Sequence, residues 1–321
     1  MNMIRKCIGL VWAVIKYTVL AIVLTVLIHV AHALTLDKIV QYTQVQVSSP
    51  YFPVALGTYR MAFIADTHAI ADADLQQVVD RLNTMDLDVL LLGGDFSRVD
   101  GAYRRHLGIL SQVQTRDGIW GVAGNYDHSG ILLGPASYYG IEILNNWGTH
   151  LHPGFYLAGT EDIWHGFPDY EQAMRGHQPN DFVLFLAHNP DASMRFASTN
   201  IDLMLSGHTH GGQITLFGLY APVMDIARLP FGHSIPPSAQ GQRFTSGFAR
   251  ADSGTLVYVN RGVGHEQLLR VFARPEVTVI ELTHGAASYR VRVDWLDVVF
   301  WSGVVGLGMS VYAYRKVKRE I

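Results

Sequence analysis

The sequence predicts an α/β fold, with mixed β-sheets inside, helices outside and a membrane segment at each end. In the first half of the central region, short apolar runs alternate with amphipathic stretches, as in β-α-β units whose parallel strands lie under helices. The last third alternates with a period of two, which predicts antiparallel strands. Long apolar runs near both ends are typical of membrane helices.

The composition excludes some classes of protein. At 321 residues the chain can form one large domain or two small ones. Its net charge is −3 and its central region has no block rich in lysine and arginine, so a nucleic-acid partner is not expected. Cys7 is the single cysteine, which rules out an intrachain disulfide.

Residues 1–35 are predicted to be an N-terminal membrane anchor. The apolar run Tyr17–Leu34 is interrupted only by the imidazoles of His29 and His32, and it approaches the roughly 20 residues that a spanning helix needs. A cleaved signal peptide is the alternative, because Ala31-His32-Ala33 resembles a cleavage site. The run is long for a signal peptide, which favours a retained anchor.

Residues 297–321 are predicted to be a C-terminal membrane segment with a basic tail. The run Val298–Tyr314 is short for a span, so an amphipathic helix on the membrane surface is the alternative. Basic residues flank the two runs on their outer sides: Arg5, Lys6, Lys16, Arg315, Lys316, Lys318 and Arg319. The positive-inside rule then places residues 36–296 on the far, periplasmic side of a bacterial inner membrane.

The central region predicts the following order of elements. Strands are expected at 61–66, 88–95, 119–125, 155–159, 182–187 and 201–205, and helices at 71–84 and 103–113. Strands of the antiparallel type are expected at 213–218, 254–260, 276–283 and 288–295. The stretch 229–243, rich in Pro, Gly and Ser, predicts a long loop that could be a lid or a substrate-facing insertion.

Five of these strands end in side chains that bind metals. The tips read Asp66-Thr67-His68, Gly94-Asp95, Gly124-Asn125, His188 and Gly207-His208-Thr209-His210. A single Asp, Asn or His at a strand end is more often a turn or cap residue. Because ligands collect at the carboxyl ends of strands in α/β sheets, five such tips predict one dense cluster of ligands.

The predicted cluster suits two divalent metal ions. Its oxygen and nitrogen ligands are more than one tetrahedral zinc site uses. A carboxylate can bridge two cations about 3.5–4 Å apart and hold a phosphate group across them. The mixed donor set, which lacks a thiolate, suits Mn, Fe, Zn or Co.

The sequence resembles the calcineurin-like metallophosphoesterase superfamily in five motifs. In chain order they are Asp-x-His, Gly-Asp, Gly-Asn-x-Asp, a strand-end His and Gly-His-x-His. The resemblance covers residues 61–212, and Asn260-Arg261-Gly262-Val263-Gly264 extends it to about residue 282. The block at 207–213 is most similar to the membrane-anchored bacterial branch that resembles UDP-2,3-diacylglucosamine pyrophosphatase-like phosphoesterases. The resemblance implies a four-layer α/β/β/α sandwich for residues 36–296.

The resemblance also implies roles for seven ligands. One metal ion would be held by Asp66, His68 and His210. The second would be held by Asn125, His188 and His208, with Asp95 bridging the two. The nucleophile would be a bridging hydroxide, so no covalent intermediate is expected.

The sequence departs from the superfamily at Tyr126, where most members have a histidine that stabilises the transition state or protonates the leaving group. Either His128 substitutes, or Tyr126 donates a hydrogen bond, or the leaving group needs little protonation. We therefore expect Asp95, Asn125, Tyr126 and His128 to be catalytic. The departure favours a pyrophosphate or an activated diester as substrate. The acid expected three residues after Asp95 is also replaced, by Arg98.

The sequence as a whole predicts a metal-dependent hydrolase of a phosphodiester or pyrophosphate bond, with a lipid-linked substrate. A specific alternative is a UDP-2,3-diacylglucosamine pyrophosphatase of lipid A biosynthesis, whose cytoplasmic substrate conflicts with the orientation inferred above. An alternative of another class is a metal-binding membrane scaffold or sensor of low activity. Nuclease activity is not expected, because the net charge of the chain is negative and the predicted membrane segments tether it to a membrane.

Overall fold

The computed structural model describes residues 2–96, 102–127, 129–195, 200–226, 238–264, 270–292, 294 and 296–305. Two residues named above, Arg98 and His128, lie outside these ranges. So do most of the expected loop at 229–243 and the C-terminal run beyond residue 305.

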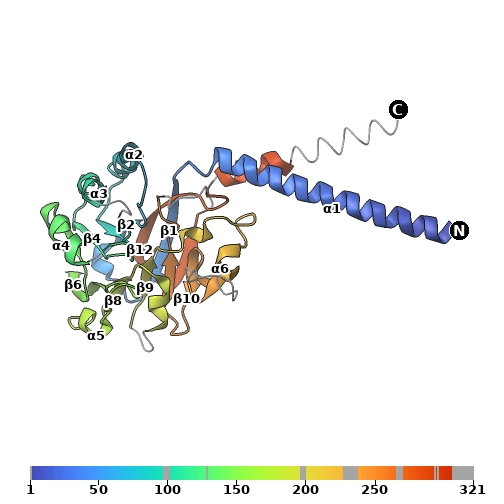
Figure 1. Ribbon diagram of the computed structural model, residues 1–321. Helices are drawn as coiled ribbons and strands as arrows, with labels where there is room; N and C mark the ends of the chain where they lie inside the picture. The colour runs from blue at the N-terminus through green and yellow to red at the C-terminus, as the bar shows by residue number, and fades with distance from the viewer. Residues whose placement is uncertain are drawn as a thin grey trace.

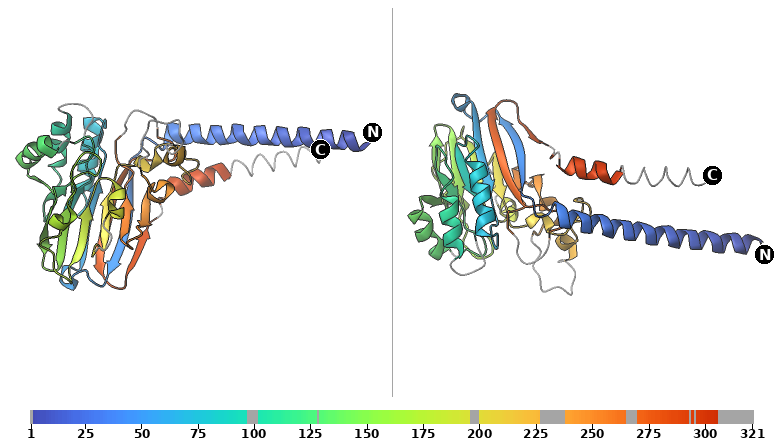
Figure 2. Two further views of the ribbon diagram at one scale, coloured as in Figure 1. Left: turned by 60° about the horizontal axis from the view of Figure 1, so that its bottom comes forward. Right: turned by 90° about the horizontal axis from the view of Figure 1, so that it is seen from above.

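One long apolar helix projects from the domain. α1 (Asn2–Thr35) leaves one side of the molecule (Figure 1), and its stretch Arg5–Thr35 is long and apolar enough to cross a membrane. At 1.5 Å per residue these 31 residues extend about 46 Å, more than the roughly 30 Å of a hydrocarbon core. The shorter apolar helix Leu296–Val305 leaves the domain on the same side (Figure 2).

The first sheet is mixed and has seven strands. β2 to β5 run parallel to one another, β12 is antiparallel to β2, and β1 is parallel to β12. In spatial order the strands are β13 (Ser288–Val291), β1 (Gln41–Ser49), β12 (Glu276–His284), β2 (Thr58–Ile64), β3 (Val89–Leu92), β4 (Ile119–Gly121) and β5 (Ile141–Ile143).

The second sheet is also mixed and has six strands. β11, β9, β8 and β7 are parallel, and β10 and β6 close the two edges in antiparallel pairs. In spatial order the strands are β10 (Gly247–Arg250), β11 (Leu256–Val259), β9 (Leu203–Ser206), β8 (Phe182–Leu186), β7 (Phe155–Gly159) and β6 (Trp147–His152).

Helices cover the outer face of each sheet, which confirms the predicted layered α/β fold. α2 (Asp72–Leu82), α3 (Ala102–Leu110) and α4 (Ser129–Tyr138) pack on the first sheet. α5 (Tyr170–Ala173) and the short helices η2 (Pro190–Met194) and η4 (Gly241–Phe244) pack on the second. The remaining short helices are η1 (Val54–Leu56), η3 (His210–Gly212) and α6 (Pro222–Ile226).

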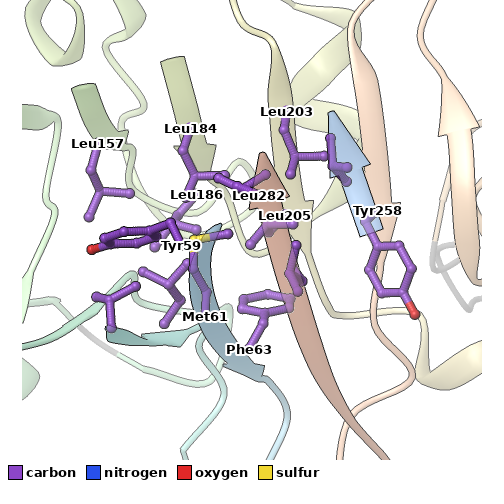
Figure 3. Packing of buried hydrophobic residues seen from close by; sticks show 14 of the residues in the cluster. Tyr59, Met61, Phe63, Leu157, Leu184, Leu186, Leu203, Leu205, Tyr258 and Leu282 are labelled. Carbon is purple, nitrogen blue, oxygen red and sulfur yellow. The ribbon is translucent and has the colours of Figure 1, made fainter. Parts of the chain in front are cut away.

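The main core lies between the two sheets. Alternate residues of β2, such as Met61 and Phe63, point toward leucines of β8 and β9, such as Leu184 and Leu205 (Figure 3). Side chains of this size contribute about 1.5–3 kcal/mol each when fully buried. The facing sheets therefore hold their strand ends in fixed positions at one edge.

Two expectations for the last third are wrong. Residues 213–218 form only isolated bridges, Ile214 with Val271 and Leu216 with Tyr220, because Gln213 and Phe217 have positive φ and interrupt an extended chain. β11 and β12 each have a parallel neighbour, so this part is not simply antiparallel. A period of two reports which face is buried, and it carries no information about the direction of the neighbouring strand.

Candidate metal centre

The carboxyl ends of five strands meet at one edge of the two sheets, as expected from the sequence. The tips of β2, β3 and β4 come from the first sheet and those of β8 and β9 from the second. They form two buried groups able to hold a metal ion. The first group is Asp66, His68 and His210, and the second is Asp95, His188 and His208.

In the first group three donor atoms face one another. His68 Nε2 lies 3.2 Å from His210 Nε2, and Asp66 Oδ1 lies 3.7 Å and 3.6 Å from these two nitrogens. Ligand atoms bound to one ion at about 2.1 Å are separated by about 3 to 3.5 Å. The three side chains therefore fit a single divalent cation.

In the second group the donors converge on His188. Its Nδ1–H donates to the carbonyl oxygen of Gly93 at 2.7 Å, which leaves Nε2 as the nitrogen available for a metal. This Nε2 lies 3.1 Å from Asn125 Oδ1, 3.2 Å from His208 Nδ1 and 3.2 Å from Asp95 Oδ2. The structure thus brings Asn125 to the second group.

Asp95 lies between the two groups. Its Oδ2 is 3.2 Å from His188 Nε2 of the second group and 3.5 Å from His68 Nε2 of the first. Its Oδ1 accepts a hydrogen bond from the backbone N–H of Tyr126 at 2.8 Å, which fixes the orientation of the carboxylate. This is the geometry that a bridging ligand requires.

Strained backbone conformations orient the candidate ligands. Among the described residues, nine non-glycine residues have positive φ, and five of them are Asp66, His68, Asp95, His208 and His210. Such conformations cost about 1–3 kcal/mol each and persist only where the surroundings enforce them. Five of the nine strained residues are therefore candidate ligands, which supports this edge as the candidate metal centre.

Glycines allow the strand tips to approach one another. A Cβ at Gly124 would overlap Asp95 Oδ1, and one at Gly207 would overlap Asp66 Oδ2. Each of these glycines stands beside a ligand of its own strand tip. Their place in the motifs is therefore explained by space for carboxylates.

Burial and neighbouring charges shift the pKa values of the site residues in different directions. Burial raises the pKa of Asp66 to about 7, although His188 opposes this shift. Burial acts on Asp95 in the same direction, but His188 and His68 lower the pKa of Asp95 to about 2. Burial lowers the pKa of His210 well below its usual value, which keeps this imidazole in the neutral form that binds metals.

Asp127 is a site residue whose role the sequence did not reveal. Its carboxylate accepts backbone hydrogen bonds from Asp95 at 2.5 Å, Phe96 at 3.0 Å and Gly124 at 2.9 Å. It therefore ties the tip of β3 to the tip of β4. The signal was present, because Asp127 closes the Gly-Asn-x-Asp motif.

Replacing Asp127 by asparagine is expected to weaken metal binding about 10- to 100-fold, the usual effect of losing a partner that orients a ligand. An amide has one acceptor oxygen, so it cannot accept hydrogen bonds from all three N–H groups, which belong to the tips of both β3 and β4. Titration calorimetry with Mn²⁺ measures the change. Asp80→Asn on the exposed face of α2 is the matched control, and equal affinities in the two variants would contradict this role for Asp127.

Two aromatic side chains border the site. The ring of Tyr126 is exposed and packs edge-on against His68, with centroids 5.4 Å apart. Trp164 packs edge-on against His208, with centroids 4.3 Å apart. The structure thus places Tyr126 beside the first group, where it can contact a substrate.

Known proteins are similar to this chain over the region that contains these motifs. A profile of the calcineurin-like phosphoesterase family matches residues 59–212, a range that contains all seven proposed ligands. The chain is 30% identical over 247 residues to the phosphodiesterase YaeI of Escherichia coli (strain K12), covering 72% of this chain and 85% of that protein.

The names of two further relatives mention a membrane and a substrate. The chain is 26% identical over 294 residues to a transmembrane protein with metallophosphoesterase domain of Danio rerio, covering 83% of this chain and 63% of that protein. It is 29% identical over 140 residues to the UDP-2,3-diacylglucosamine pyrophosphatase LpxG of Chlamydia muridarum (strain MoPn / Nigg), covering 43% and 40%.

Proposed function

We propose that this chain, which belongs to the calcineurin-like phosphoesterase family, hydrolyses a phosphodiester or pyrophosphate bond of a lipid-linked substrate with two divalent metal ions. The observation that carries the proposal is the position of Asp95 Oδ2, within 3.5 Å of a histidine nitrogen in each ligand group. Asp66, His68 and His210 would hold one ion, and Asn125, His188 and His208 the other.

The side chains of the site have separate tasks in this reaction. When bound, two divalent cations activate water for attack and neutralise charge on the phosphate. Asp95 fixes the spacing of the two groups, and the Gly93 carbonyl fixes the tautomer of His188. Burial of Asp66 and Asp95 excludes bulk water and so strengthens their electrostatic interactions.

The residue that protonates the leaving group decides the substrate class. Tyr126 stands where most family members have histidine, and the pKa of an ordinary phenol, about 10, makes it a weaker acid than imidazolium. When a phosphoanhydride is hydrolysed, the leaving group is a phosphate, which does not need the proton that an alkoxide leaving group needs. Tyr126 at this position therefore favours pyrophosphates and activated diesters as substrates over alkyl monoesters.

A second candidate is hydrolysis of UDP-2,3-diacylglucosamine. It is favoured by the similarity to LpxG, whose name states that activity. The two candidates differ in topology, because a nucleotide-sugar substrate is cytoplasmic. We propose the periplasmic side of a bacterial inner membrane, with residues 1–35 as anchor, 36–296 as catalytic domain and 297–321 as a second membrane segment.

The test uses the full-length protein in detergent with Mn²⁺. An aryl phosphodiester, an aryl phosphate monoester and UDP-2,3-diacylglucosamine are assayed in parallel, with His208→Ala as the control. We expect diester hydrolysis to exceed monoester hydrolysis and to disappear in His208→Ala. Activity that survives in the variant would contradict the proposed site, and metal binding without turnover on any substrate would favour a scaffold or sensor.

A further inference from the structure

An exposed apolar segment lies where α1 meets the domain. Residues 214–223, here called the apolar loop, follow the ligand segment that ends in η3. Five of the ten residues expose large apolar side chains, and Leu219 is 88% exposed; the five are Ile214, Leu216, Leu219, Tyr220 and Val223. Single exposed apolar residues are ordinary, whereas a contiguous patch marks a contact surface.

The apolar loop is attached to the membrane helix. The backbone N–H of Phe217 donates to His29 Nε2 at 3.4 Å, and the two rings lie 4.6 Å apart. His32 packs on Phe272 with ring centroids 3.8 Å apart. Both views of Figure 2 show the gold segment around α6 beside the domain end of α1.

These contacts fix the depth of the apolar loop. His29 and His32 belong to the apolar run 17–34 of α1. About 20 residues of α1 fill the hydrocarbon core, so its last turns, which carry the two histidines, lie at the boundary of the bilayer. Any segment packed against His29 must lie at that boundary as well.

A pocket of about 360 Å³ opens beside the apolar loop, between α1, the C-terminal helix and the domain. One part of its wall is apolar and includes Phe217, Leu219 and Trp301. Another part is polar and includes Gln242, Thr245 and Arg261. A ligand that contacts both parts has to be amphipathic.

We propose that this pocket binds one phospholipid of the membrane, with its phosphate head group at the polar wall and its acyl chains along the apolar loop. The inference rests on the anchoring of α1 proposed above and is independent of the hydrolytic activity. The volume lies in the range of small-ligand sites.

Arg261 supplies the cation for the head group. Its Nε donates to the Arg274 carbonyl at 3.0 Å and its Nη2 to Gln41 Oε1 at 2.7 Å, which hold the guanidinium in the wall; Glu276 Oε2 is 3.6 Å from Nε. Arg274 and Asp297 line the same pocket, and Arg274 Nη1 is paired more closely, with Asp294 Oδ2 at 2.8 Å and Asp297 Oδ1 at 3.1 Å. Arg261 is therefore the less compensated of the two cations.

The pocket also borders the metal centre. Its wall includes Gly211, which directly follows the proposed ligand His210. A lipid in the pocket therefore contacts the segment that positions one ligand. This arrangement brings the head group of a membrane lipid close to the site proposed to act on lipid-linked phosphate.

Photolabelling of the full-length protein tests this proposal. The protein is reconstituted in vesicles of phosphatidylcholine and phosphatidylglycerol that contain a phosphatidylglycerol with a diazirine on its acyl chain. We expect adducts on peptides from 211–221 and 296–305. Leu219→Asp and Ser246→Trp, both at exposed positions of the pocket, should lower this yield at least fivefold. Tyr138→Asp on the distant α4 should not.

The remaining outcomes overturn the inference. Adducts confined to α1, or equal yields in all folded variants, would show lipid around the anchor only; melting temperatures verify the fold of each variant. Competition by soluble glycerol phosphate as effective as that by long-chain phospholipid would indicate a phosphate site. Diester hydrolysis by the same wild-type sample is scored separately, so a labelled but inactive protein counts against the proposed function alone.

Discussion

Replacing Asp95 by alanine is expected to lower kcat/KM about 10³-fold and to remove both metal ions. Asp95 Oδ2 is the one oxygen within 3.5 Å of histidine nitrogens of both groups among the described residues. Metal ions contribute several kcal/mol to phosphate hydrolysis, and each 1.36 kcal/mol corresponds to a factor of ten in rate. Elemental analysis of the purified variant and steady-state kinetics with an aryl diester measure the two effects.

Two comparison variants test whether the loss of metal and activity is specific to Asp95. Asp80→Ala, on the exposed face of α2, should retain both ions and full activity. His68→Ala removes a ligand of one group, so it should lower the ion content by about one per chain. Asp95→Ala with both ions and undiminished turnover would rule out the two-metal mechanism.

The sequence was sufficient to predict that the candidate ligands meet, because each one follows a strand. Parallel strands bring their carboxyl ends to one edge, so the positions of Asp66, Asp95 and His188 along the chain already imply that they meet. Their conformations could not be predicted in this way. The positive φ of Asp66 and Asp95 depends on contacts between strand tips, which come from distant parts of the chain.

The edges of the sheets were harder to predict than the centres. β3 and β8 are buried on both faces and give continuous apolar runs such as VLLL. β1 reads QYTQVQVSS and is mostly polar, because one of its faces is partly exposed, and no strand was expected there. Its partner β12 was expected, but its parallel pairing with β1 depends on a connection of more than 200 residues.

Arg270 illustrates a residue whose role only the three-dimensional structure reveals. Arginine is normally exposed, and its sequence neighbours give no reason to expect otherwise. Here the side chain is fully buried, and burial lowers the pKa of Arg270 to about 10. Its guanidinium donates to the carbonyl oxygens of Gly264 at 2.6 Å, Arg261 at 2.7 Å and Ala273 at 3.1 Å.

Replacing Arg270 by methionine is expected to lower the free energy of unfolding by about 3 kcal/mol. Buried carbonyls that lose their donors cost about 1–3 kcal/mol each, partly offset because a cation no longer has to be desolvated. For a domain of this size the loss corresponds to a fall in Tm of about 6–12 °C. Thermal unfolding in detergent measures it, with Arg105→Met as the control, since Arg105 pairs with Asp72 at the surface and contributes less than about 1 kcal/mol.

Replacing Arg270 by methionine is also expected to weaken metal binding, because the segment held by Arg270 supports the candidate ligand Asp66. The backbone N–H groups of Val263 and Gly264 donate to the carbonyls of Ala65 and Asp66 at 3.1 Å and 2.8 Å. Arg270→Lys separates the two contributions, since a lysine keeps the charge but cannot reach several carbonyls in a planar fork. If lysine restores both Tm and metal affinity, a single ammonium group that carries the charge is sufficient. If it behaves like methionine, the planar geometry of the guanidinium supports the site.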